Sequence, residues 1–245
     1  MQIAPVLVAL SVAWGQSQLP AGKVARIDGA QDVKVRNAQG TLVASVGDSL
    51  YTADHVLTGA GQSVAITLKD ESEIVVGPSS DLVVKDIATP QRHSTRLSLL
   101  YGMLHTWVKQ HYSSDQPFVV ETPTAAMGVR GTEFVVEHDP KAGQSQVHTL
   151  DGTVSLAKSF TDLLKPGSFL DVGAGMMSAL APGMALPAAA RQFSPQELLN
   201  RLKIDPFKAL PKSFVPAMPA VPKLVPDMPK IPAPKRIQDL KNLFN

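Results

Sequence analysis

The residues best suited to chemistry in this sequence lie in the stretch TPTAAMGVRGTEFVVE, positions 122–137. Arg130 is flanked there by Gly128 and Gly131 and stands just before an alternating apolar pattern. Its guanidinium group offers a planar fork of donors that can hold a carboxylate or several carbonyl oxygens. Glycines let the backbone bend sharply or approach a neighbouring strand closely. We therefore expect a sharply bent strand start at which Arg130 is held in place.

Two roles are open for the Arg130 guanidinium: it organises a turn, or it binds a ligand. In the first role its partners are backbone carbonyls or a buried carboxylate, for which the candidates are Glu121, Glu133 and Asp151. Breaking a buried ion pair costs about 3 to 5 kcal/mol, because one charge is left uncompensated. If Arg130 belongs to such a pair, we expect its replacement to unfold a marginally stable domain.

Patterns for catalysis or metal binding are weak. The sequence contains neither a Gly-x-Ser-x-Gly nucleophile elbow nor a His-Glu-x-x-His zinc motif. The closest histidines, His105 and His111, would lie about 20 Å apart along a strand, so we expect ordinary surface histidines. The carboxylates of Asp70, Glu71 and Glu73 fit a polar hairpin tip. Since the chain also lacks cysteine, which excludes thiolate sites, we expect no enzyme activity, no metal and no cofactor.

The surrounding chain shows a strand pattern from residue 23 to residue 158. Apolar and polar residues alternate in short bursts such as 64–68 and 118–122, which is typical of strands with one buried face. Glycine-containing turn signals separate the bursts, and further strands are expected at 169–172 and 176–180. The absence of βαβ alternation argues against a dinucleotide-binding or P-loop fold. The pattern predicts a mainly β fold, an antiparallel sandwich, barrel or solenoid.

The N-terminal residues resemble a secretory signal. A short apolar run at 3–12 precedes Ala13-Trp14-Gly15, whose small residues suit a signal peptidase. The run is about half of the roughly 20 residues that a membrane span needs, and no Lys or Arg precedes it. We expect a signal peptide at 1–15 and a periplasmic or secreted protein without a transmembrane segment. The alternative is a buried N-terminal strand.

The C-terminal part changes in composition after residue 180. Residues 181–213 are expected to form a linker with a short helix at 195–204, which Ser194 and Pro195 begin. In residues 214–245, proline at nearly every third position favours an extended polyproline II rod. A short amphipathic helix is expected to end this tail.

The C-terminal part is also basic. From Arg201 onward there are nine Lys or Arg and three Asp or Glu, a net charge of +6. The tail is either a solvated linker or contacts an anionic surface such as membrane headgroups or a cell-wall polymer. We do not expect nucleic-acid binding, because the basic excess lies in a proline-rich segment with few aromatic residues.

The order of a strand, Thr-Pro, Arg-Gly-Thr and a second strand resembles the FecR domain family. These elements stand here as 118–121, Thr122-Pro123, Arg130-Gly131-Thr132 and 134–136. The candidate binding or scaffold motif therefore consists of Thr122, Pro123, Gly128, Arg130, Gly131 and Thr132.

Further segments extend the resemblance over about residues 23–158. The family's Gly-Asp and Thr-Gly opening corresponds to 47–50 with Thr58-Gly59, and its Asp-Gly-Ser turn corresponds to 68–74. Its Leu-x-x-Gly-x-Leu strand pair corresponds to 99–104, and its closing hairpin corresponds to 147–154. Within the Asp-Gly-Ser turn, Glu71 replaces the usual glycine.

The resemblance implies an all-β domain outside the cytoplasm. Well-known members are membrane-spanning sensors that read an outer-membrane iron-siderophore receptor and control a sigma factor. We expect this chain to lack the transmembrane and sigma-factor-regulating parts, because its sequence shows no internal transmembrane helix and no cytoplasmic helical region. The β domain itself is predicted at 23–180.

The sequence thus predicts a non-catalytic, exported FecR-type domain that acts as a binding or signalling module for a protein partner in the cell envelope. The alternative is a structural protein that binds cell-wall polymer or carbohydrate, which retention on purified peptidoglycan would identify. An enzymatic alternative would require a hydrolytic activity that substitutions of Arg130 or Glu133 abolish while the fold survives.

Overall fold

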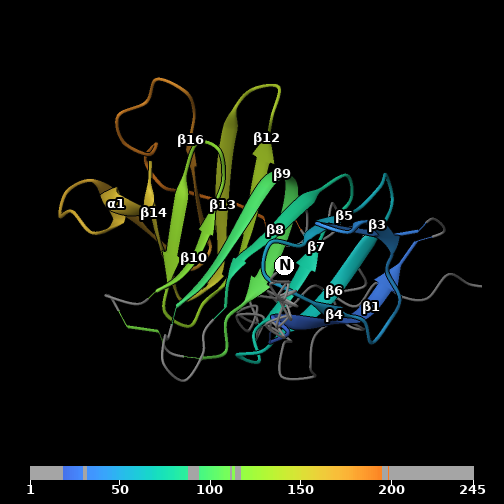
Figure 1. Ribbon diagram of the computed structural model, residues 1–245. Coiled ribbons are helices and arrows are strands. Elements are labelled where there is room, and N and C mark those ends of the chain that lie inside the picture. The colour runs from blue at the N-terminus through green and yellow to red at the C-terminus, as the bar shows by residue number, and fades with distance from the viewer. Residues whose placement is uncertain are drawn as a thin grey trace, which may run out of the picture. The chain divides into compact units, whose positions relative to one another are not determined.

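The computed structural model describes residues 19–29, 32–87, 94–110, 112–113, 117–194 and 198 (Figure 1). All of them belong to a compact unit that spans Met1–Ala209. The predicted signal peptide at 1–15, most of the predicted helix at 195–204 and the basic tail at 214–245 lie outside the described residues. These three predictions therefore remain predictions.

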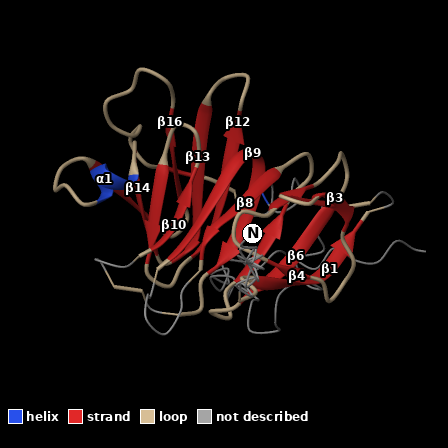
Figure 2. Ribbon diagram, viewed as in Figure 1, coloured by secondary structure: helices blue, strands red, loops and turns tan. Residues whose placement is uncertain are grey.

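The described residues form seventeen strands and one short helix, α1 (Phe160–Leu163) (Figure 2). We call the two layers of strands sheet A and sheet B. Across sheet A the order is β4 (Ser49–Leu50), β1 (Gly22–Asp28), β6 (Ser63–Leu68), β7 (Glu73–Val76), the C-terminal half of β9 (Thr95–Trp107), β12 (Glu133–Asp139), β13 (Gln144–Asp151), β16 (Met176–Leu180) and β17 (Arg191–Gln192). Across sheet B it is β3 (Gly40–Val43), β2 (Lys34–Asn37), β5 (His55–Leu57), β8 (Asp81–Asp86), the N-terminal half of β9, β10 (Phe118–Glu121), β11 (Ala126–Val129), β14 (Thr153–Ala157) and β15 (Phe169–Gly173).

The predicted mainly β fold is confirmed. Among the described strands every pairing is antiparallel except that of β9 with β10, which is parallel. Because β9 belongs to both layers, the strands form one large mixed sheet that does not close on itself. The strands expected at 169–172 and 176–180 are present as β15 and β16.

Strand β9 passes from sheet B into sheet A at Gly102. The φ of this residue is +96°, a left-handed conformation that side chains disfavour. A Cβ atom here would also lie 2.6 Å from Ser80 Cα. The Ser80 hydroxyl accepts a hydrogen bond of 2.9 Å from the amide of Met103, just after the bend. Only glycine fits this crossing.

After β9 the chain crosses between the layers at regular intervals. It places β10 and β11 in sheet B, β12 and β13 in sheet A, β14 and β15 in sheet B, and β16 and β17 in sheet A. This alternation of hairpins gives the described part of the chain its solenoid-like character. Each crossing needs a tight corner, and one of these corners holds Arg130.

The core lies between the two sheets and follows the predicted alternation. Phe118 and Val120 of β10 and Phe134 and Val136 of β12 are fully buried in it. Replacing a buried phenylalanine by alanine costs about 3 to 5 kcal/mol, so these positions hold the layers together. None of the helices that the structure describes is long and apolar enough to cross a membrane.

A second apolar cluster covers the outer face of sheet A. It consists of buried Val75, Met103 and Val135 from three adjacent strands and buried Leu198 from the segment after β17. The ring of Phe193 meets the ring of His148 edge to face at a centroid distance of 5.0 Å. Phe193 and Leu198, which follow β17, therefore pack on sheet A.

Candidate functional site

The motif residues Arg130, Gly131 and Thr132 form the corner between β11 in sheet B and β12 in sheet A. Gly131 has a φ of +112°, which a residue with a side chain adopts only under strain. Thr132 is buried, and its hydroxyl donates a 3.2 Å hydrogen bond to the carbonyl of Thr153. Its own carbonyl accepts a 3.0 Å hydrogen bond from the amide of Val108. The expected sharp bend is therefore present, and Gly131 and Thr132 hold it.

A second corner packs against the first. Gly152, between β13 and β14, has a φ of +80°, and a Cβ atom on it would lie 3.2 Å from the carbonyl oxygen of Gly131. It would also lie 3.1 Å from the Thr132 hydroxyl. The Arg-Gly-Thr segment and the Asp-Gly turn of the closing hairpin thus form one double corner, which fixes the position of Arg130.

The Arg130 side chain itself does not stabilise this corner. It is exposed and makes no hydrogen bond or ion pair with any of the described residues. Of the expected carboxylate partners, Glu133 pairs with His105 at 2.7 Å, and Glu121 pairs with Arg96 at 2.7 Å. Of the two roles open to Arg130, a buried ion pair is therefore not the one found among the described residues, since Arg96 and His105 on other strands contact two of the candidate carboxylates.

A depression of about 330 Å³ opens beside Arg130 on the outer face of sheet B. It is lined by Pro117, Gly128, Val129, Arg130, Gly131, Thr132, Thr153, Ser155, Leu163, Leu164, Phe169 and Asp171. One wall is apolar, and its Leu164 is 53% exposed. On another wall the Ser155 hydroxyl donates a 2.6 Å hydrogen bond to Asp171. The depression can accept an apolar group that carries a carboxylate for Arg130.

Helix α1 supplies the apolar wall and lies over Gly128. A Cβ atom on Gly128 would lie 3.4 Å from Leu163, in ordinary van der Waals contact, and the φ of Gly128 is not positive. The hydroxyl of Ser159 caps α1 by accepting a 3.3 Å hydrogen bond from the amide of Asp162. The expectation that both flanking glycines bend the chain therefore holds for Gly131 but not for Gly128.

The other two motif residues lie at the far end of the hairpin that β10 and β11 form. The hydroxyl of Thr122 accepts a 2.9 Å hydrogen bond from the amide of Ala125, and the adjacent Pro123 is exposed. Ser145 Oγ lies 2.7 Å from the same hydroxyl. The four residues of β11 separate this turn from the Arg130 corner by about 14 Å. The motif thus splits into a turn at one end and a depression at the other.

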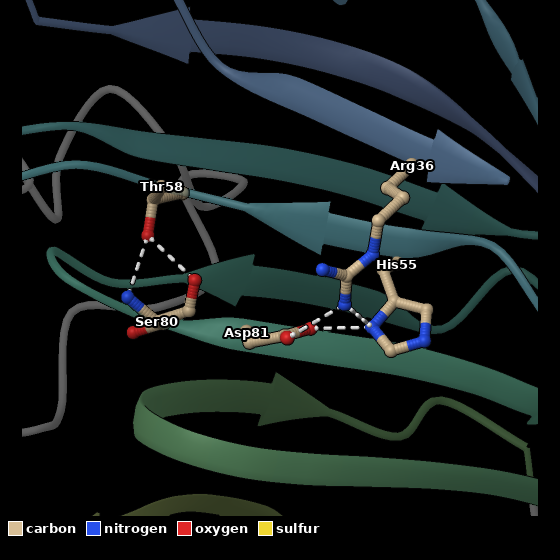
Figure 3. A network of polar contacts seen from close by, with 5 residues as sticks. All are labelled: Arg36, His55, Thr58, Ser80 and Asp81. Carbon is tan, nitrogen blue, oxygen red and sulfur yellow. Dashed lines mark hydrogen bonds and ion pairs between the residues drawn. The ribbon is translucent and has the colours of Figure 1, made fainter. Parts of the chain in front are cut away.

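A polar network that the sequence does not reveal lies on the outer face of sheet B (Figure 3). His55 Nδ1 lies 2.9 Å from Asp81 and 2.8 Å from the Arg36 guanidinium, which also reaches Asp81 at 3.4 Å. A single ring nitrogen either donates to Asp81 or accepts from Arg36. The tautomer of the His55 ring therefore decides which of the two partners Nδ1 binds.

Beside this network, the Thr58 hydroxyl ties two loops together. It accepts a 3.0 Å hydrogen bond from the amide of Ser80 (Figure 3). It also donates a 2.6 Å hydrogen bond to the carbonyl of Gly77. Thr58 lies 19 positions before Gly77 and 22 positions before Ser80 in the sequence. In the Arg36 network the separation reaches 45 positions, between Arg36 and Asp81. Only the strand register brings them together, so no local pattern could have identified them.

The expectation of ordinary surface histidines is wrong for three of them. His105, His138 and His148 are all buried. His105 donates to or accepts from Glu133, whose second oxygen, Oε2, has no hydrogen-bond partner among the described residues. Burial raises the pKa of Glu133, although the His105 hydrogen bond acts in the opposite direction. Position 111 lies outside the described residues, so the proposed spacing to His105 is not testable.

The three carboxylates of the predicted hairpin tip separate into different environments. Asp70 is buried and bonds the hydroxyl of Tyr112, and burial together with this bond raises the pKa of Tyr112. Glu73 pairs with Lys109 at 2.7 Å. Glu71 is exposed. Throughout the described ranges, no group of three or more potential metal ligands comes together.

Comparison with protein families matches residues 54–155 to the family described as FecR protein. Two crystal structures of a candidate anti-sigma factor from Parabacteroides distasonis ATCC 8503 also match, each with a TM-score of 0.48 and with 15% and 14% sequence identity. Each match covers 59% of this chain and 62% of the other protein's chain. No curated protein sequence matches the chain. The double corner and Arg130 lie within the matched residues 54–155, which are similar to the FecR family, whereas the depression also takes in Leu163, Leu164, Phe169 and Asp171 beyond the match.

Proposed function

We propose that this chain is a non-catalytic, exported FecR-type module that binds a protein partner in the cell envelope, and that the depression beside Arg130 is the contact site. The observation that carries the proposal is an exposed guanidinium group, without a partner among the described residues, on a rigid corner next to an apolar wall. Its position is fixed by Gly131, Thr132 and Gly152. The fold thus presents Arg130 without using it.

The chemistry of the depression indicates what the partner presents. An arginine binds a carboxylate through two parallel hydrogen bonds, while Leu164 and Phe169 favour an apolar group next to that carboxylate. Asp171, held by Ser155, stands in the same depression and disfavours a partner with excess negative charge. The proposed contact is therefore a single acidic residue flanked by apolar side chains.

Site-specific photo-crosslinking in the native cells tests this proposal. A photoreactive residue in place of Leu164, 53% exposed beside Arg130, is expected to capture one envelope protein. A photoreactive residue in place of Leu186, 51% exposed, is the matched control and is expected to capture none. Equal capture at both positions would contradict the proposal.

Arg130→Ala is expected to abolish the crosslink from position 164, since a hydrogen bond to a charged group contributes about 1.5 to 3 kcal/mol. Because Arg130 is exposed, the free energy of unfolding should change by no more than about 0.5 kcal/mol. Arg191→Ala, which removes another exposed arginine, is expected to leave the crosslink intact. Loss of the crosslink in both variants would mean that general charge, not the corner, attracts the partner.

A second depression favours the alternative function, binding of cell-wall polymer. It measures about 540 Å³ and lies between the turn at Asn37, Ala38 and Gln39 and the loop that carries Tyr51. A partly exposed tyrosine ring beside side-chain amides offers both the apolar face and the hydrogen-bonding groups that a sugar ring requires. Retention of the full chain on purified peptidoglycan, lost in Tyr51→Ala, would favour this function over a protein partner.

The export of the chain is part of the proposal and is tested separately. Cell fractionation of a strain that produces the full chain is expected to recover it outside the cytoplasm, shortened at its N-terminus as a signal peptide at 1–15 requires. Deletion of those residues should retain it in the cytoplasm. An uncleaved chain in the cytoplasmic fraction would contradict the periplasmic or secreted location.

A further inference from the structure

Strand β3 forms the outer edge of sheet B and is exposed along its whole length. Among the described strands it pairs only with β2, and Figure 1 shows it at the margin of the sheet. Leu42 is 61% exposed, Val43 54% and the nearby Val46 64%. These three residues concentrate apolar surface within five positions of the chain, outside the FecR match at 54–155. Such concentration is typical of an interaction site.

The backbone of β3 offers hydrogen bonds to an incoming strand. The amide of Ala44 donates a 2.8 Å hydrogen bond to the carbonyl of Val33, which identifies these two residues as a hydrogen-bonded pair. Hydrogen-bonded and non-hydrogen-bonded pairs alternate along an antiparallel ladder. In the β2–β3 register, Thr41 and Val43 therefore direct their N–H and C=O groups away from β2.

The described edge strands other than β3 are protected. β4 and β17 have two residues each, and β15 carries the charged Asp171 and is partly buried. Proteins commonly protect sheet edges by short length, charge or proline. The sequence of β3, GTLV, has no charge and no proline. This edge alone among those described combines exposure, apolar side chains and outward-directed backbone groups at Thr41 and Val43.

We propose that β3 accepts an extended segment of a partner protein as an added strand, with acidic side chains on one face and apolar side chains on the other. Val35 points into the core, so Lys34 and Arg36 on either side of it project from the outer face of sheet B. Because Arg36 already pairs with Asp81, Lys34 supplies the positive charge for a partner. The added strand would lie two strand spacings, about 10 Å, from β2, so its acidic side chains would meet the long Lys34 side chain across Val43. Its apolar side chains would cover Leu42 and Val46.

A partner segment fits this edge better than a second copy of the chain. Stable dimers bury about 1,200 to 2,000 Å² in total, whereas β3 has only four residues to pair. Strand addition to a short edge is an established way for domains to bind extended peptides, with backbone hydrogen bonds for affinity and alternate side chains for specificity. The surface is distinct from the depression beside Arg130, so the two proposals stand independently.

The test uses the full chain and two fluorescent ten-residue peptides. One alternates glutamate with valine and threonine, and the other has lysine in place of each glutamate. Fluorescence anisotropy is expected to show binding of the glutamate peptide and at least about tenfold weaker binding of the lysine peptide, a difference of about 1.4 kcal/mol. Lys34→Glu should reduce or reverse this preference.

Val43→Pro is the variant that separates strand addition from other modes of binding. Its amide points away from β2, so proline removes a hydrogen bond to the added strand and none to the fold. Circular dichroism and Tm should stay unchanged while affinity for the glutamate peptide falls about tenfold, or about 1.4 kcal/mol. Independently of this variant, hydrogen exchange with peptide bound should slow at Thr41 and Val43 but not at Leu42.

Several results would overturn the inference. These are no binding of the glutamate peptide, equal binding of both peptides, uniform protection along β3, or loss of binding in Arg130→Ala, which would place the peptide at the other site. If the chain instead forms dimers that Val43→Pro dissociates, the occupant is a second copy and no partner strand is needed. If the Arg130→Ala variant still binds the glutamate peptide, the result supports strand addition at β3. This holds whether or not the depression beside Arg130 proves to bind a partner protein.

Discussion

At the scale of single residues, the Arg130 motif divides into parts that shape the backbone and one part that faces solvent. Gly131 and Thr132 determine the corner through a positive φ and a buried hydroxyl. Gly128 and Arg130 leave the backbone unstrained and line the depression instead. Substitutions of these neighbours should therefore separate stability from binding.

Gly131→Ala is expected to destabilise the domain, because alanine would be forced to a φ near +112°. The cost of such backbone strain is about 1 to 3 kcal/mol. Gly128→Ala is the matched control and should cost nothing measurable, since its added methyl group would meet Leu163 at an ordinary contact distance. Urea denaturation of both variants measures the difference. Equal losses would show that the positive φ does not determine the corner.

Glu71 stands where the FecR pattern has glycine, and its φ is +65°. This is the left-handed region, in which a residue with a side chain is strained by roughly 1 kcal/mol. Glu71→Gly is therefore expected to raise the free energy of unfolding by up to about 0.5 kcal/mol, once the entropic cost of glycine of about 0.5 to 1 kcal/mol is subtracted. Lys69 lies in the same turn but has no positive φ, so Lys69→Gly should lower the free energy of unfolding through the entropic cost of glycine. A stability loss in both variants would contradict this account.

At the scale of elements, strand register buries titratable side chains that the alternating pattern assigned to the surface. His138 of β12 lies on the inner face of sheet A, where its Nδ1 is 2.9 Å from the Ser145 hydroxyl of β13. Burial lowers the pKa of His138, although the charge of Asp139 acts in the opposite direction. The folded state therefore favours the neutral ring, while the unfolded state binds a proton near pH 6.5.

This difference predicts a pH dependence of stability. The contribution of His138 is fully present above pH 6.5 and is lost as the pH falls from there toward its lowered pKa. The slope for one proton is at most about 1.4 kcal/mol per pH unit. His138→Gln should reduce the slope of unfolding free energy between pH 7.5 and pH 5, measured by urea denaturation. An unchanged slope would mean that other groups dominate the acid sensitivity.

At the scale of the whole molecule, the chain after β17 contributes to the packing of sheet A. Leu198→Ala is expected to lower the free energy of unfolding by about 2 kcal/mol, because it leaves Val75, Met103 and Val135 partly uncovered. Leu186→Ala, at a position 51% exposed, is the control and should change it by less than about 0.5 kcal/mol. Thermal unfolding compares the two. Equal small effects would show that the segment after β17 contributes little.

The fold class could be predicted from the sequence because alternation and turn residues are local signals. Strands such as β10, β15 and β16 follow directly from the apolar pattern. The long-range placements could not be predicted, since the partner of Glu133 is a histidine 28 positions away. The same limit hid the contribution of α1 to the depression and left the choice between the two roles of Arg130 open. The motif can be recognised from the spacing of its residues in the sequence. The side chains that surround it are known only once the pairing register of the strands is known.

Strand β9 gives the two layers a common backbone. Sliding one layer over the other would require breaking ladder hydrogen bonds on both flanks of this strand, so the layers should melt in a single cooperative transition. Mechanical load applied to the sheet B surface, where both proposed contacts lie, would pass through continuous covalent chain into sheet A. Because the two layers share this strand, a displacement of one layer is transmitted to the other through the chain itself.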